Sequence, residues 1–159
     1  MQKKNIIYPF DISLVQEILG DYLNSKNTEH RFRMYDYPLE NQIFGMDIYQ
    51  YLKKFYQLSL CESSYADIRK IYTIYEHKKC MKLRLKYMID NHYIDEIDSI
   101  LETYTILENT ALTTCNLLLK YNITKNENIL TKVLISIEKM ETTERICLSE
   151  LLIHLQKYV

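Results

Sequence analysis

The sequence contains very few of the residues that interrupt helices. Its 159 residues include two glycines and two prolines, whereas average usage would give about 11 and 8. Sandwiches and barrels of β-strands need such residues at most of their tight turns. The composition therefore argues against both architectures, and we predict an all-α protein of helices joined by polar loops.

An excess of charge of one sign is also absent. Lysine and arginine total 20 and aspartate and glutamate total 21, so the formal net charge is -1. A nucleic-acid-binding surface normally carries a clear basic excess, and we expect no nucleic-acid partner. No apolar run approaches the roughly 20 residues that cross a bilayer, and residues 1–13 do not resemble a signal peptide. We therefore expect no membrane insertion and a location in the cytoplasm.

The motifs that usually carry chemistry are missing as well. Two glycines are too few for a glycine-rich phosphate loop. The four cysteines form no CxxC pair, and the closest approach to a zinc motif is His77 with Cys80. The acidic run at residues 94–102 is typical of a solvated helix face. We predict no enzyme, no catalytic residue, no cofactor and no metal, with an enzyme assembled from distant residues such as His92 and Glu102 as an alternative.

Helical periodicity is present along most of the chain. Asp11 is placed to cap a helix that extends to residue 23, and helical spacing resumes at 46–56 and again after Ser63 and Ser64. The polar stretch 25–41, which contains Pro38, is predicted to be the longest loop. Two further apolar patterns cover 80–91 and 94–104, and the sequence leaves open whether they form one bent helix or two.

The second half of the chain is predicted to hold the centre of the fold. Residues 109–119 carry no charge, and their apolar members cover a broad arc of a helical wheel. We therefore expect a central helix at about 106–121, enclosed by the others. Two more helices, 128–140 and 146–158, are expected to pack antiparallel across a short turn at 140–145. The result is a single domain, 1–159, of six or seven helices.

Some apolar residues lie outside the arc that a core requires. On the helix at 11–23 the apolar arc is about 180° wide, against roughly 100° for a core-facing stripe, and Ile12, Leu19 and Leu23 form one edge of it. On the helix at 128–140, Ile135 projects from the polar face. We predict that these four residues contact another protein. A single exposed isoleucine is common, however, and carries little weight alone.

Three stretches resemble the poxvirus Bcl-2-like family of intracellular immunomodulators. DISLVQEILGDYL at 11–23 is similar to the first helix of that family, and IYQYLKKFY at 48–56 to the second. The third stretch joins ENTALTTCNLLLKYNI to the segment 129–159, and is similar to the family's central helix and closing hairpin. The chain departs from the family at Tyr121 and Asn122, and it lacks the NWGR-like signature of cellular Bcl-2 proteins.

The resemblance implies a Bcl-2-like bundle and a virulence factor that acts by protein binding. In one branch of the family, soluble members bind a host signalling protein and inhibit innate immune responses that run through NF-κB or interferon regulatory factors. In the other branch, a surface groove sequesters the BH3 helix of a pro-apoptotic protein. The missing signature and the lack of a hydrophobic tail favour the first branch. Several of its members pair through helices one and six, which implies a homodimer through Ile12, Leu19, Leu23 and Ile135.

Overall fold

The computed structural model describes residues 9–32, 42–61 and 64–159. Over these residues the chain forms five α-helices and two short 3-10 helices, and no β-strand. In chain order the elements are α1 (Ile12–Leu23), η1 (Thr28–Arg31), α2 (Asp47–Cys61), α3 (Arg69–Asp90), α4 (Asp98–Thr124), α5 (Glu127–Leu155) and η2 (Gln156–Tyr158). The predicted all-α class is confirmed.

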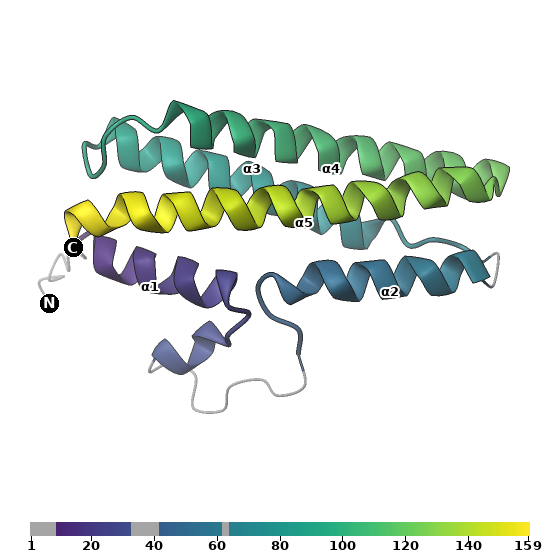
Figure 1. Cartoon of the computed structure of the whole chain (residues 1–159), viewed down its shortest axis with the longest axis horizontal. Coiled ribbons are helices and arrows are strands. Elements are labelled where there is room, and N and C mark those ends of the chain that lie inside the picture. The colour runs from purple at the N-terminus through teal and green to yellow at the C-terminus, as the bar shows by residue number, and fades with distance from the viewer. Residues whose placement is uncertain (1–8, 33–41, 62–63) are drawn as a thin grey trace, which may run out of the picture.

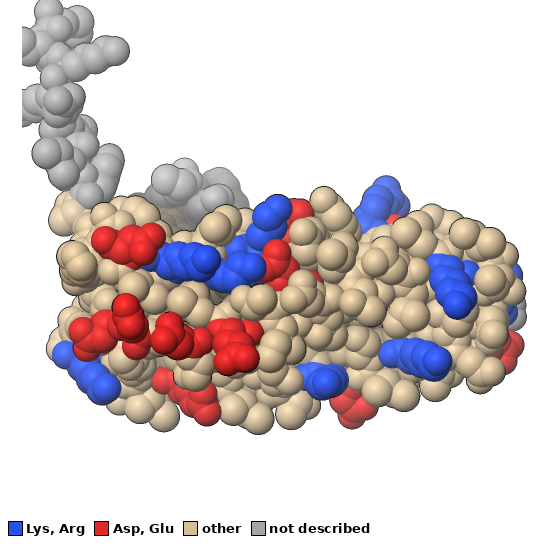
Figure 2. Space-filling view, turned by 90° about the horizontal axis from the view of Figure 1, so that it is seen from above, with Lys and Arg blue, Asp and Glu red and all other residues tan. Residues whose placement is uncertain are grey.

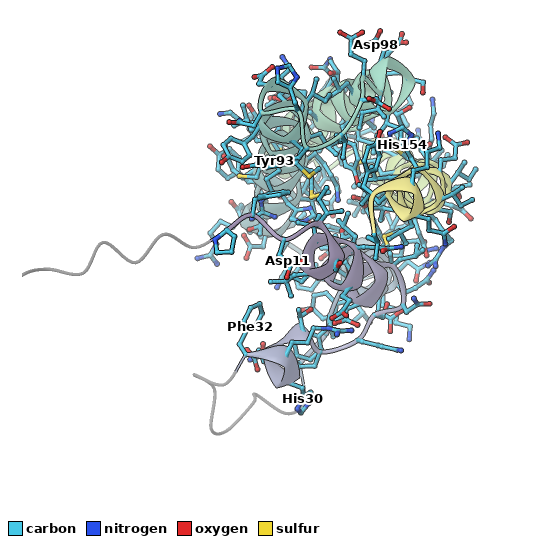
Figure 3. All side chains as sticks on the ribbon, turned by 90° about the vertical axis from the view of Figure 1, so that its left-hand side faces the viewer. Asp11, His30, Phe32, Tyr93, Asp98 and His154 are labelled. Atoms are coloured by element: carbon cyan, nitrogen blue, oxygen red, sulfur yellow. The ribbon has the colours of Figure 1, made fainter. Side chains whose placement is uncertain are left out.

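The bundle consists of three long helices, α3, α4 and α5, and two shorter ones, α1 and α2. Figure 1 shows the long helices side by side, with α4 antiparallel to both α3 and α5, while α1 and α2 follow one another along the opposite side of α5. The central member is α5, since it packs against α1, α2 and α4. Figure 3 views the bundle along its length: side chains fill the space between the helices, and α1 lies below the others. The buried apolar side chains form one continuous core.

The helix ends follow local sequence signals. Asp11 caps α1 as predicted, because its carboxylate accepts a hydrogen bond from the backbone N–H of Leu14 at 3.0 Å. Asn126 caps α5 in the same way, accepting from the N–H of Asn128 at 3.0 Å. The predicted cap for the third helix does not occur, since α3 begins at Arg69, five residues after Ser64; Ser63 lies outside the described residues.

One glycine allows α1 and α2 to follow each other closely. Gly45 has a φ of +53°, and a Cβ at this position would lie 2.1 Å from the carbonyl oxygen of Tyr22. The same carbonyl accepts a hydrogen bond from the N–H of Met46 at 3.0 Å. Only glycine fits such a close approach of two backbones. The predicted loop at 25–41 contains η1, and its residues 33–41 lie outside the described part of the chain.

The predicted closing hairpin is wrong. Residues 140–145 lie in the middle of α5, which continues without a break to Leu155. The buried positions Ile137, Met140, Glu144 and Cys147 keep helical spacing through the segment, so its apolar face never changes phase. The sequence pattern indicated a turn because Glu144, a charged residue, occupies one of those buried positions. The helix count of six or seven is too high, because α5 spans the predicted turn and α4 spans both the pattern at 94–104 and the predicted central helix at 106–121.

The uncharged segment is not enclosed at the centre of the molecule. It belongs to the longer helix α4, which packs against α3 and α5 and leaves Ile106, Leu112 and Leu119 exposed to solvent. The position at the centre of the bundle is taken by α5. The question left open for residues 80–104 is settled as two helices, since α3 ends at Asp90 and α4 begins at Asp98.

Candidate functional site

An apolar cleft lies between α1 and α3. It encloses about 500 Å3. Its walls are apolar or aromatic apart from Arg84, and consist of Phe10, Val15, Ile18 and Leu19 on one side and Met81, Leu83, Leu85, Tyr87 and Met88 on the other. The volume lies within the range of binding sites for small ligands and for the anchor side chains of peptides.

The sequence of α3 provides two sets of apolar residues to the cleft, one that forms its floor and one that forms its rim. Met81, Leu85 and Met88 recur at helical spacing and are buried, so they form the floor. Leu83 and Tyr87, four residues apart, are 56% and 53% exposed and form a rim one helix face away. A core-facing helix normally presents polar residues at such rim positions. The rim is therefore the part of the cleft available to another molecule.

Aromatic rings close one end of the cleft. Phe10 stacks on Tyr93 with ring centroids 4.0 Å apart and an interplanar angle of 15°. Figure 3 shows Tyr93, from the loop between α3 and α4, above Asp11 at the start of α1. This contact joins the chain before α1 to the end of α3, so the shape of the cleft is fixed at this end by stacking.

The wall of the cleft contains one basic residue. Arg84 is exposed on α3 and is the single charged side chain among the lining residues. Figure 2, seen from above, shows acidic side chains gathered at the end where α4 begins, with basic side chains beside them. In the acidic run predicted to be solvated, Asp95, Glu96, Asp98 and Glu102 are all exposed, although Asp95 and Glu96 precede α4. A ligand with negative charge on its flank would be attracted to Arg84.

A second unusual feature is a charged cluster inside the core. Lys78 and Glu144 are both 0% exposed, and the ammonium nitrogen Nζ lies 2.6 Å from Oε1 and 2.7 Å from Oε2 of the carboxylate. The hydroxyl of Tyr49 donates to Oε2 at 2.7 Å, and that of Tyr22 lies 3.3 Å from the same oxygen. Every described α-helix contributes to this cluster, with Tyr104 from α4 completing it.

The electrostatics of the cluster follow from its burial. Burial lowers the pKa of Lys78, and Glu144 opposes this by stabilising the charged form. The pKa of Tyr49 is raised well above its usual value by burial and then by Glu144. His77, stacked on Tyr22 at the edge of the cluster, has its pKa lowered to about 3 by burial and by the charge of Lys78. The hydroxyl of Tyr104 has no hydrogen-bond partner within the described structure.

The cluster serves the fold. Lys78 and Glu144 have no surface that a substrate in solvent can reach. A buried ion pair of this kind contributes little net stability, but a wrong pairing of helices would strand a charge in the core. We interpret the cluster as a device that fixes the relative register of the helices. Sequence analysis missed it, although the spacing of Ile74, Lys78 and Met81 places the lysine on the buried face of α3.

The four residues of the predicted interface do not come together. Leu19 is buried, and Ile12 and Leu23 pack partly buried against the core, so the wide apolar arc of α1 is largely covered by the protein itself. Ile135 is exposed on the first third of α5, whereas α1 lies beside its C-terminal half (Figure 1). The homodimer stays a prediction, but a surface shared by these four residues is not present in one copy of the chain.

The remaining sequence expectations concern single residues. Cys115 and Cys147 are buried as expected, whereas Cys61 and Cys80 are exposed. His92 and Glu102 are exposed, the first on a loop and the second on α4. Among the described residues, no group of three or more histidine, cysteine, aspartate or glutamate side chains is placed to hold a metal ion. Within the same part of the chain, no helix combines the length and the apolar character needed to cross a bilayer.

Comparison with known proteins adds no family to this description. The chain was compared with protein-family models, curated proteins and solved structures, and none of the three comparisons found a match.

Proposed function

We propose that the protein is a non-enzymatic binding protein whose α1–α3 cleft captures an amphipathic helix of its partner. The observation that carries this proposal is the apolar rim of the cleft, Leu83 and Tyr87, which the protein's own core leaves uncovered. An amphipathic helix binds such a groove with apolar anchors at positions i, i+3, i+4 and i+7. From residue 81 to residue 88, α3 extends about 10 Å, which matches about two turns of a bound helix.

The border of the cleft favours a partner helix with acidic residues. Arg84 lies in the wall of the cleft and is exposed. A bound helix whose apolar face enters the cleft would bring its flanking residues next to this cation. Opposite charges at such a rim raise the association rate and select among partners more than they add affinity.

For the identity of the partner, we propose a host signalling protein of the NF-κB or interferon regulatory factor pathways, so that occupancy of its surface inhibits innate immune signalling. This choice of partner rests on the resemblance to the poxvirus family at residues 11–23 and 48–56. The third similar stretch supports it less, because the predicted closing hairpin is a single helix in this protein. Sequestration of a pro-apoptotic BH3 helix is the second candidate. The cleft favours that second candidate, because BH3 recognition is itself of the helix-in-groove type.

Titration with helical peptides tests the binding mode. The probes are fluorescent two- to four-turn peptides with apolar anchors and glutamate flanks, the same peptides with lysine flanks, and a panel of BH3 peptides. We expect micromolar or tighter binding of the acidic series and at least about tenfold weaker binding of the lysine series. Leu83→Glu should weaken binding at least about tenfold, whereas Leu58→Glu, at an equally exposed leucine on α2, should leave it unchanged.

The outcomes separate the candidates. Tight binding of several BH3 peptides that is lost in Leu83→Glu would favour the apoptotic function. Binding of acidic helices without BH3 preference, together with inhibition of an NF-κB or interferon reporter in host cells that Leu83→Glu abolishes, would favour the signalling function. Absence of saturable binding by every helical probe, or equal binding by the Leu83→Glu variant, would overturn the role of the cleft.

A further inference from the structure

The outer face of α5 carries a line of exposed isoleucines. Ile135, Ile146 and Ile153 are 61%, 56% and 65% exposed. At about 100° per residue, the second lies only about 20° from the first around the helix and the third returns to the same direction. The line is about 27 Å long, at 1.5 Å per residue over 18 residues. Isolated exposed isoleucines are ordinary, whereas three on one helix face make that face a candidate interface.

Nothing in the described part of the chain covers this face. In Figure 1, α5 lies in the foreground between α4 on one side and α1 and α2 on the other. Beside it, α4 contributes one more exposed apolar residue, Ile106. The side-chain hydrogen bond between Thr114 and Ser136 fixes how the two antiparallel helices align. Ile106 lies eight residues before Thr114 on α4, and position 144 lies eight residues after Ser136 on α5. Because the helices are antiparallel, Ile106 lies level with position 144, in the middle of the isoleucine line.

The exposed charges within about 60° of the isoleucine line are Lys132, Glu138, Lys139 and Glu150, and two of them bear on which molecule fits the face. Lys139 and Glu150 are exposed and lie about 40° and 60° to the same side of the isoleucine line. Neither is in an ion pair within the described residues. The midpoint between Ile135 and Ile153 is position 144, and the midpoint between Lys139 and Glu150 falls between positions 144 and 145.

We propose that the outer face of α5 binds the same face of a second copy, antiparallel, about a two-fold axis near position 144. A two-fold axis in the interface and perpendicular to the helix keeps each side of the helix on the same side and reverses its direction. Ile135 then meets Ile153 of the second copy, and Lys139 meets Glu150 of the second copy. Each contact occurs twice. A single axis satisfies the apolar and the charged pairs together.

The remaining charge near the axis is already compensated. Arg145 lies close to position 144 and would approach its own counterpart in the second copy. It lies about a quarter turn away from the isoleucine line, however, and its guanidinium Nη2 is 3.9 Å from Oε1 of Glu141 on the same helix. Ile106 from each copy adds apolar area near the axis. This surface lies outside the α1–α3 cleft, so the proposal does not depend on that cleft.

Exchanging the charges of Lys139 and Glu150 distinguishes the proposed dimer from a nonspecific hydrophobic contact. Sedimentation equilibrium on the full chain, from about 1 μM to 1 mM, measures the monomer–dimer constant. Lys139→Glu and Glu150→Lys each replace two attractive pairs with two repulsive pairs, and we expect about tenfold or more weaker dimerisation from either one. The double variant Lys139→Glu/Glu150→Lys restores both pairs with reversed polarity, and we expect its constant to return to within about threefold of the original.

The isoleucines provide the second arm of the test. Ile146→Glu places two carboxylates near the axis and should weaken the dimer at least about 100-fold. Ile123→Glu is the matched control, since Ile123 is an exposed isoleucine at the end of α4, and we expect no change. Circular dichroism confirms that each variant stays folded. A protein that is monomeric over the whole range, a dimer insensitive to Ile146→Glu, or a double charge variant no better than the single ones would overturn the proposal.

Discussion

The ion pair between Lys78 and Glu144 gives the most demanding test of the folded structure. We consider three variants, Lys78→Met, Glu144→Gln and the two together. Methionine matches the length of the lysine side chain without its charge. The introduced glutamine keeps an oxygen that accepts the hydrogen bond which the Tyr49 hydroxyl now donates to the carboxylate at 2.7 Å. Each single variant leaves one charge in the core without its partner, whereas the double variant leaves none.

The expected losses have an upper bound, because a stranded charge can be neutralised. Unpaired Lys78 would have to give up a proton from a usual pKa of about 10.4, which at pH 7 costs about 4.6 kcal/mol at 1.36 kcal/mol per unit. This agrees with the roughly 3–5 kcal/mol typical of broken buried pairs, and we expect a loss in the same range for Lys78→Met. The double variant should lie within about 2 kcal/mol of the original protein.

Urea unfolding followed by circular dichroism measures these free energies. In Glu144→Gln, the folded-state pKa of Lys78 falls further below its unfolded value, so the loss relative to the original protein should shrink as the pH rises towards 10. A double variant as unstable as the two single losses added together, or single losses below about 1 kcal/mol, would refute the coupled buried pair.

The other predictions concern the groups around that pair. Tyr49→Phe removes a hydrogen bond to a charged acceptor and should cost about 2 kcal/mol, whereas Tyr104→Phe removes a buried hydroxyl without a partner and should be neutral or stabilise by up to about 1 kcal/mol; equal losses in urea unfolding would contradict this. His77 has a folded pKa of about 3, so stability should fall as the pH drops from about 6.5 towards 3, and His77→Gln should reduce that slope by about 1 kcal/mol per pH unit. An unchanged slope in His77→Gln would contradict the burial of the ring.

Local signals predicted much of the fold. The cap at Asp11 and the periodicity after it predicted α1 to within a residue, and the scarcity of glycine and proline predicted the all-α class. These features depend on residues close together in the chain. The turn at Gly45 depends on the carbonyl of Tyr22, more than 20 residues away, and no local pattern indicates it.

The errors in the second half of the chain have one physical origin. A charged residue is normally a sign of a solvated face or a turn, because burial of an isolated charge is costly. Glu144 and Lys78 escape that cost only because they meet each other, from helices 66 positions apart in sequence. The sequence pattern therefore indicated a turn at 140–145. The cleft was missed for a related reason, since it requires the packing of α1 opposite α3 to be known.

The position of the charged cluster also bears on function. The described α-helices contribute Tyr22, Tyr49, Lys78, Tyr104 and Glu144 to it, and the pair at its centre is closed to solvent. A bundle fixed in this way keeps its helix faces in constant relative positions even where those faces are apolar and exposed. Binding surfaces built on fixed helices lose little conformational entropy when a partner docks. The cluster would therefore support the protein binding that we propose at the α1–α3 cleft and along α5, without taking part in either contact.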